Sequence, residues 1–356
     1  MEAASIPARI TRGGSPVLAA LRRFLSRFGL IIALLALPLV YGTLDIVHGD
    51  GLSHILENLK DGISNGSIWA LVAIGYTLVY GIIELINFAH GEVFMIGSFV
   101  SFSVWSSLGV GLVTAAGGKV GGLLLTGLVA MVACGALNVM IERVAYRPLR
   151  NAPKLAPLIT AVGFSFILQN VGLEWLGGTQ HGVDDLINAQ KDFFTIGGVH
   201  ITHADALAVG VTVPLVLLLV AFVQKSRLGK AMRATAQDPE AARLMGINVD
   251  HTISLTFLLG GMMAGAAGLI FALYETTIRF DQGFEAGLIA FTAAVMGGIG
   301  NLRGAVLGGL IIGCIQQISD DRLASEWTPA IVFAYLIVIM TFRPQGLLGE
   351  ETREAG

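Results

Sequence analysis

The stretch ISLTFLLGGMMAGAAGLIFALY, residues 253 to 274, contains 22 residues and no charged side chain. An α-helix rises about 1.5 Å per residue, so this stretch is long enough to cross a hydrocarbon core of about 30 Å. Its four glycines allow close approach of neighbouring helices. The stretch therefore predicts a transmembrane helix that packs against protein rather than only against lipid.

The whole chain has the composition of a membrane protein. Of its 356 residues, 54% are hydrophobic and only 13% are charged. A water-soluble domain of this composition would expose large apolar patches. The small net charge of −3 and the lack of a long basic run exclude nucleic acid as an expected partner. Cys134 and Cys314 stand alone inside apolar segments, which is not the spacing of a metal site or a disulfide framework.

Ten segments are predicted to cross the membrane. Two of them, 285–300 and 304–318, are short and rich in glycine, and they form either two thin spans or one re-entrant hairpin. The predicted fold class is an all-α polytopic membrane protein with eight to ten transmembrane helices, some of them short or broken. The eight full-length spans are predicted at 29–47, 62–83, 88–110, 120–141, 155–176, 204–224, 253–274 and 328–342.

The distribution of basic residues predicts the orientation. Lys and Arg cluster before the first predicted span, after the fourth and after the sixth, which all fall on one side, whereas the opposite connections are mainly acidic. Short cytoplasmic loops carry an excess of Lys and Arg, so the basic side is predicted to be cytoplasmic, with both termini there if the count is ten. A cleaved signal peptide in residues 1–44 is the alternative for the N-terminus, but the charged lead is long and no convincing cleavage site follows. The expected division is a cytoplasmic segment 1–28, a transmembrane domain 29–342 and a cytoplasmic tail 343–356.

The polar stretch ATAQDPEAARLMGIN, residues 234–248, lies between two apolar segments and has the signals of a short helix. Asp238 is a good N-cap, and Pro239 fits the first helical turn. Glu240 complements the positive end of the helix dipole. Gly246 can adopt the left-handed conformation that ends a helix. The sequence therefore predicts a capped helix of about two turns.

One face of this predicted helix is apolar. Ala241, Leu244 and Met245 lie at positions i, i+3 and i+4, on an element too short to be stable alone in water. We expect the helix to dock on a protein partner. A helix lying at the lipid headgroups fits the same stripe, although such helices usually have a longer apolar face and aromatic anchors.

Several motifs together resemble a known family. Glu240, Ala241, Ala242 and Gly246 form an EAA-x-x-x-G pattern similar to the loop of ATP-binding-cassette (ABC) importer permeases. As a set, five stretches between about residues 60 and 349 resemble the branched-chain amino-acid importer permeases. They are GYTLVYGII at 75–83, INFAHGE at 86–92, IERVAYRPL at 141–149, LMGIN at 244–248 and AFTAAVMGGIG at 290–300.

The resemblance implies a five-part machine in the bacterial cytoplasmic membrane. Two homologous but different permeases form the pathway, two ATPase subunits bind ATP and Mg, and an external binding protein delivers leucine, isoleucine, valine or a related amino acid. Transport by alternating access is then coupled to the ATPases through the loop 225–250. The implied ATPase-coupling residues are Asp238, Pro239, Glu240, Ala241, Ala242, Leu244, Met245 and Gly246.

No nucleotide site is expected on this chain. The segment from Gly298 to Gly304 superficially resembles a phosphate-binding loop, but it lacks the preceding strand and the Lys-Ser/Thr pair. Helix packing is the favoured interpretation, with Gly304, Gly308 and Gly309 on one helical face. The chain is therefore expected to be a transporter subunit without cofactor and without enzymatic activity of its own.

Polar side chains inside the apolar segments are the candidates for the translocation pathway. They are Asn87, His90, Glu92, Gln169 and Asn170. For the stretch 84–92 the favoured interpretation is a polar cytoplasmic turn between the second and third spans, and a break near the pathway is the alternative. The amides at 169 and 170 more often hydrogen-bond between helices, at a gain of about 1 kcal/mol each.

Two other function classes fit part of the sequence. An ion-coupled secondary transporter or channel explains the spans, but it needs no docking helix and usually has coupling carboxylates deep in the membrane. An intramembrane enzyme needs a paired nucleophile and base, which the sequence does not provide. Within the family, a permease for urea or short amides remains the alternative substrate class.

Overall fold

The computed structural model describes residues 40–43, 51–115 and 118–349, apart from 151, 154, 185–187, 197 and 324. The predicted N-terminal segment 1–28 and most of the predicted span 29–47 lie outside these residues.

Long helices account for most of the described chain, which confirms the predicted all-α class. Each of the other nine predicted spans falls on one helix. Seven helices of the described residues are long and apolar enough to cross a membrane, namely α2, α4, α5, α6, α9, α11 and α12. The long helices are α2 (Gly51–Ile83), α3 (His90–Ala115), α4 (Lys119–Ile141), α5 (Leu155–Leu176), α6 (His203–Lys225), α9 (Val249–Glu275), α10 (Gln282–Gly297), α11 (Leu302–Arg322) and α12 (Thr328–Phe342).

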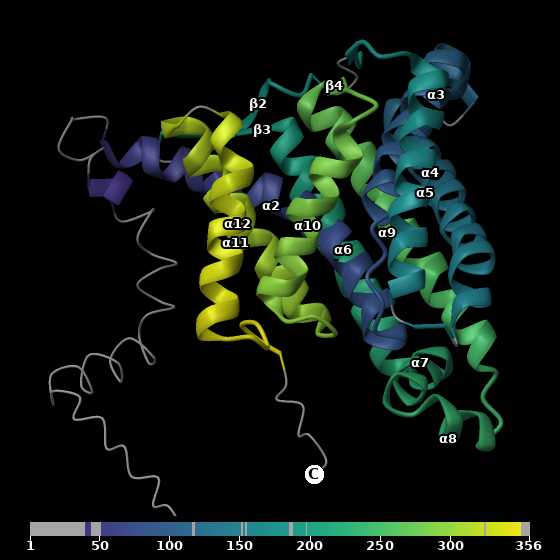
Figure 1. Ribbon diagram of the computed structural model, residues 1–356. Coiled ribbons are helices and arrows are strands. Elements are labelled where there is room, and N and C mark those ends of the chain that lie inside the picture. The colour runs from purple at the N-terminus through teal and green to yellow at the C-terminus, as the bar shows by residue number, and fades with distance from the viewer. Residues whose placement is uncertain are drawn as a thin grey trace, which may run out of the picture.

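Short elements connect these helices at two ends of the bundle (Figure 1). One end carries α7 (Arg227–Gln237) and α8 (Pro239–Leu244) and is called the α8 end. The opposite end carries the strands and is called the strand end. There β1 (His181–Gly182) pairs with β4 (Thr277–Ile278), and β2 (Asp192–Ile196) pairs with β3 (Val199–Thr202), both antiparallel.

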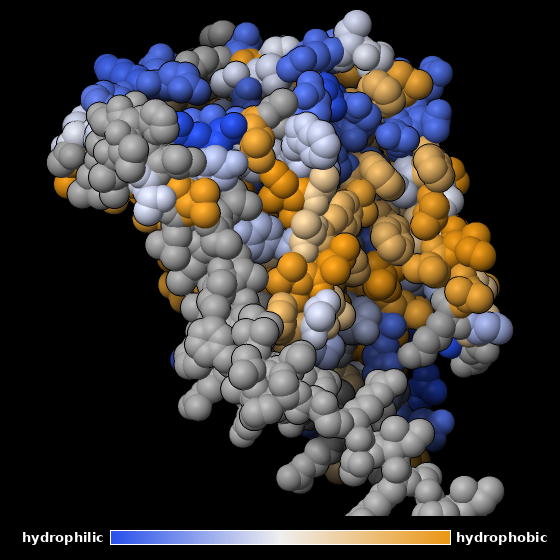
Figure 2. All heavy atoms as spheres, turned by 60° about the vertical axis from the view of Figure 1, so that its left-hand side comes forward, coloured by the Kyte–Doolittle hydropathy of each residue, from blue (hydrophilic) through white to orange (hydrophobic). Residues whose placement is uncertain are grey.

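The surface between the two ends is apolar. Figure 2 shows a broad hydrophobic band below a hydrophilic cap at the strand end. The outward face of α4 belongs to this apolar surface, with Val120, Leu124, Leu128 and Val132 all more than half exposed. Such side chains are stable on the outside of a protein when lipid or another membrane protein covers them. The fold is therefore that of a polytopic membrane protein.

Glycines bring the central backbones into contact. A Cβ added at Gly313 of α11 would overlap the Cα of Gly66 on α2, and one at Gly309 would lie 2.6 Å from Ala70 Cα. Gly304 and Gly308 instead contact α10, at Gly297 and Ala293. The predicted common face for Gly304, Gly308 and Gly309 is therefore wrong, because α11 is packed on two sides.

The segments 285–300 and 304–318 form two separate helices, α10 and α11. They are consecutive and packed against each other along their glycine-rich faces. The 21 residues of α11 are enough for a full span, whereas α10 has 16 residues, or about 24 Å. One of the two segments is thus long enough to cross a membrane alone and the other is not.

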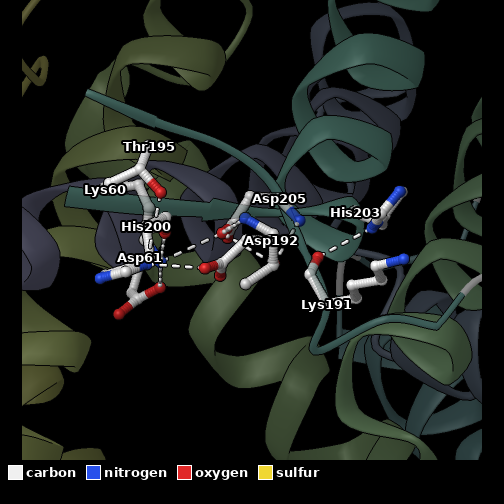
Figure 3. Close-up of polar contacts among 9 residues, drawn as sticks. Lys60, Asp61, Lys191, Asp192, Thr195, His200, His203 and Asp205 are labelled. Atoms are coloured by element: carbon white, nitrogen blue, oxygen red, sulfur yellow. Dashed lines mark hydrogen bonds and ion pairs between the residues drawn. The ribbon is translucent and has the colours of Figure 1, made fainter.

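A partly buried ion cluster attaches the β2–β3 hairpin to the helices (Figure 3). Lys60 Nζ lies 2.7 Å from Asp61 Oδ1 and 3.1 Å from Asp205 Oδ2, and it donates a hydrogen bond of 2.9 Å to the carbonyl of His200 on β3. Asp205 also forms a capping box with Thr202 at the start of α6. The cluster therefore joins α2, α6 and the hairpin at the strand end.

Candidate functional site

The helix α8 forms where the sequence predicts it. The Asp238 carboxylate accepts hydrogen bonds of 2.9 Å from the backbone N–H groups of Glu240 and Ala241. Pro239 occupies the first turn, and Gly246 has a φ of 82°, the left-handed conformation that suits glycine. These caps satisfy backbone groups that a short helix otherwise leaves open, so α8 is ordered by local chemistry.

The surface of α8 is divided into a buried and an exposed side. Ala242 is buried against the protein, whereas Leu244 is 88% exposed and Met245 is 82% exposed. Ala241 and Glu240 are exposed as well. The apolar stripe predicted from the sequence therefore faces away from this chain, at the tip of the α8 end (Figure 1).

Flanking caps fix the position of α8 between its neighbours. Ser226 caps α7 through a hydrogen bond of 2.8 Å from Gly229 N–H, and Asn248 caps α9 through one of 3.0 Å from His251 N–H. The last residue of α8 is five positions before the first residue of the 27-residue helix α9. A short connection with a capped start of α9 thus joins α8 to a long helix.

The stretch 84–92 does not form a simple turn at the membrane surface. Helix α2 ends at Ile83, Glu84 is exposed with a φ of 52°, and α3 begins at His90. His90 is fully buried against Gly75, which lies eight residues before the end of α2. The chain therefore returns into the bundle before α3 starts. In Figure 1 this connection is the blue coil that rises between the helices.

The buried polar residues of this break contact several helices. The ring of His90 meets Tyr76 edge-on at 4.8 Å between centroids. Glu92 is 1% exposed, and its Oε1 accepts a hydrogen bond of 3.2 Å from Ser165 in the middle of α5. A Cβ at Gly283 of α10 would overlap Glu92, so glycine makes room for the carboxyl group. The favoured sequence interpretation, a cytoplasmic turn, is wrong for these residues because the tight contacts with α2, α5 and α10 hold them in the interior.

The five pathway candidates do not form one site. Asn87, His90 and Glu92 are buried within the break. Gln169 is half-buried on α5, and Asn170 is exposed on the outer surface of that helix. The Asn170 amide donates a hydrogen bond of 2.8 Å to Phe166 O in the same helix, so it does not bond between helices. Gln316 does play such a role, because its Oε1 accepts a hydrogen bond of 2.7 Å from Trp69 Nε1.

Sequence reasoning missed a polar cluster where α4 meets α9. Glu142 and Arg147 were visible as a charged end of the fourth span, but their partners Asp250 and Ser254 are more than 100 residues away along the chain. The sequence does not show that α4 packs against α9, so it could not indicate this contact. Within the described residues, no group of three or more His, Cys, Asp or Glu side chains could hold a metal ion.

The apolar helical bundle, with polar elements at its two ends, defines a multi-pass membrane protein. The chain belongs to the family described as "Branched-chain amino acid transport system / permease component", whose model matches residues 58–340. It is 42% identical to the high-affinity branched-chain amino acid transport system permease protein LivH of Escherichia coli K12, over 83% of this chain and 96% of that protein. It is 40% identical to the permease protein BraD of Pseudomonas aeruginosa, with the same coverage. A probable LivH of Methanocaldococcus jannaschii is 25% identical over 83% of this chain and 93% of that protein.

Proposed function

We propose that this chain is a permease subunit of an ABC importer for branched-chain amino acids, and that α8 is the helix through which ATPase subunits drive it. Family membership supports the first part, since relatives of 40% and 42% identity are named as branched-chain amino acid permeases. The exposure of α8 supports the second part. The EAA-x-x-x-G pattern of ABC permeases falls on this same helix.

The exposed face of α8 is the observation that carries the proposal. Leu244 and Met245 project two large apolar side chains from a helix of six residues. Burial of such a side chain contributes about 1.5–3 kcal/mol, so a groove that covers both gains considerable affinity. An ATPase that closes on binding ATP must contact this helix differently in its two states for coupling to occur. A small, rigid and protruding helix suits that role.

The complete transporter needs further partners. Two ATPase subunits supply the sites for ATP and Mg, and a second homologous permease completes the pathway. An external binding protein docks at the strand end and releases the amino acid there. On this proposal the α8 end is cytoplasmic, the loop 225–250 is the coupling loop, and lipid surrounds the apolar band. Asn87, His90, Glu92, Gln169 and Asn170 remain the candidates that influence the pathway.

Affinity purification of the chain in mild detergent from its native host tests this assignment. We expect an ATPase and a second permease to copurify in stoichiometric amounts, and the reconstituted complex to take up leucine, isoleucine or valine only with ATP. Uptake that persists without ATP by the chain alone would favour an ion-coupled transporter instead. A complex that accepts urea or short amides in preference to amino acids would correct the substrate.

A pair of variants isolates the role of α8. Leu244→Asp places a charge in the proposed contact, so the amount of copurified ATPase should fall at least tenfold. Ile196→Asp changes a side chain that is 64% exposed at the opposite end of the molecule, and it should leave the ATPase bound. Normal ATPase binding and uptake by the Leu244→Asp complex would contradict the docking role.

A further inference from the structure

A set of charged residues joins the start of α9 to the end of α4, next to α8. Arg147 Nη2 donates a hydrogen bond of 2.8 Å to Asp250 Oδ2, and Arg150 bridges Asp250 and Glu142. Ser254 donates a hydrogen bond of 2.7 Å to Glu142 Oε2. We call these five residues the α4–α9 clamp. Its two α9 members lie within ten residues of α8, at the first turns of the helix that follows it.

The clamp combines one fully buried charge with partners that are partly exposed. The Glu142 side chain is 0% exposed and that of Arg150 is 19% exposed, whereas those of Asp250 and Arg147 are about half exposed. A buried charge that loses its partner is strongly destabilised. The pair of Glu142 with Arg150 is therefore costly to separate, and Arg150 connects this pair to Asp250 on α9.

A π-helical turn, Glu142–Tyr146, leads from the clamp into the interior. It begins at a clamp residue and ends at Tyr146, which is 1% exposed. Single π-helical turns are rare and are frequent at functional sites. The Tyr146 hydroxyl lies 3.1 Å from the carbonyl of Ile86 and 3.2 Å from Asn87 Oδ1, and it can donate to either. The end of α4 thus contacts the break between α2 and α3 directly.

Asn87 connects this contact to the start of α3. Its amide donates to Asn138 Oδ1 at 3.2 Å, and Asn138 in turn donates to the Phe257 carbonyl of α9 at 2.7 Å. The Asn87 carbonyl accepts a hydrogen bond of 3.0 Å from His90 N–H, at the first residue of α3. Asn87 is therefore hydrogen-bonded both to Asn138 of α4 and to the first residue of α3.

We propose that the α4–α9 clamp, Tyr146 and Asn87 form a polar linkage that transmits movement of α8 to the buried break at the start of α3. This linkage rests on the proposed function of α8 as the ATPase contact. It gives Tyr146 the role of a positioning residue for the transport cycle. The π-helical turn joins Glu142 of the clamp to Tyr146 through the backbone. The contacts at Tyr146 and Asn87 are hydrogen bonds in the buried interior, where leaving a polar group unpaired is costly. Both ends of the chain of contacts therefore move together.

The test is the ratio of amino acid transported to ATP hydrolysed by the reconstituted complex carrying Tyr146→Phe. The variant keeps the buried ring and removes only the hydroxyl. We expect ATP hydrolysis to stay within about twofold of wild type and the transport ratio to fall at least fivefold. A purely structural defect would lower both activities together and leave the ratio unchanged, which would overturn the proposal.

A control and a second variant complete the experiment. Ser101→Ala also removes a buried hydroxyl, but its hydrogen bond to Gly97 O stays within α3, so the ratio should stay at the wild-type value. Asp250→Ala opens the clamp at a partly exposed member that binds both arginines, and it should lower the ratio like Tyr146→Phe. If both act through one linkage, the double variant is no worse than the more severe single one.

The possible failures are distinguishable. Multiplicative effects of Tyr146→Phe and Asp250→Ala would show independent defects and would overturn the linkage while leaving the importer assignment intact. A wild-type complex that binds no ATPase or transports without ATP would instead refute the proposed function. A wild-type ratio in Asp250→Ala would overturn the linkage even if the Tyr146→Phe protein failed to assemble.

Discussion

At the scale of single residues, glycine determines how closely the central helices approach. Gly313 on α11 faces Gly62 and Gly66 on α2, with backbone against backbone. The sequence indicated that the glycine-rich segments pack on protein, because small residues permit such contacts. It could not indicate which neighbour each glycine meets. Gly304 and Gly309 are only five positions apart on α11, yet Gly304 contacts α10 and Gly309 contacts α2.

Gly313→Ala should destabilise the protein. The added methyl group overlaps the backbone of Gly66 and forces α2 and α11 apart, and overpacking of this kind typically costs about 1–3 kcal/mol. Gly163→Ala is the matched control, because a Cβ there meets nothing within 4 Å on the exposed face of α5. Thermal unfolding of the two purified variants in detergent gives the comparison. Equal unfolding temperatures would show that α2 and α11 accommodate the added methyl group without a loss of stability.

Buried polar residues show where sequence reasoning reaches its limit. Glu84 through Glu92 contains several polar groups between two apolar runs, which is the pattern of a surface turn. Hydropathy reports composition, and it does not report depth within the bundle. The depth of His90 and Glu92 follows from Gly75 and Gly283, whose missing side chains leave room for them.

At the scale of elements, local signals were sufficient where local chemistry decides the structure. Helix α8 is determined by Asp238, Pro239 and Gly246, which all act within a few residues, and the sequence placed it correctly. The β2–β3 hairpin depends on a distant residue. Lys60 precedes it by more than 130 positions, so nothing in the local sequence predicted how the hairpin is attached.

Lys60→Met should detach the hairpin and destabilise the strand end. The change leaves Asp205, whose side chain is 4% exposed, beside Asp61 without the shared cation. Removal of one partner from a fully buried pair costs about 3–5 kcal/mol, which is the upper limit here because Lys60 and Asp61 are partly exposed. Arg279→Met breaks the ion pair with Asp281, in which both side chains are more than 40% exposed, and it should cost at most about 1 kcal/mol. Thermal unfolding, together with proteolysis of the hairpin, measures both effects, and similar values for the two variants would contradict the role of Lys60.

At the scale of the whole molecule, hydropathy predicted the bundle well because long apolar runs have few alternatives to a transmembrane helix. The same rule says little about the arrangement of the helices. The contact of α4 with α9, on which the linkage from α8 to α3 depends, joins residues separated by about 110 positions. Such pairings arise from the complete set of packing contacts, so they became visible only in the structure.

The charges of the loops predict the orientation of the molecule in the membrane, and this prediction is directly testable. The loop that carries α7 and α8 is rich in Lys and Arg, so we expect the α8 end in the cytoplasm. Gln237→Cys reports on the α8 end and Gln180→Cys on the strand end, because both side chains are exposed. A thiol reagent that does not cross membranes should label Gln180→Cys on intact spheroplasts, and Gln237→Cys only after permeabilisation.

The unsubstituted chain provides the background for this labelling, since Cys134 is buried and Cys314 is half-buried. The reverse pattern would place α8 outside the cell, where no ATP-driven subunit could reach it. The proposed coupling role therefore requires this orientation, because an exposed helix can contact an intracellular ATPase only from the cytoplasmic side. Labelling at both ends in intact spheroplasts would indicate a mixed topology. It would contradict the assignment of the two ends from the distribution of Lys and Arg.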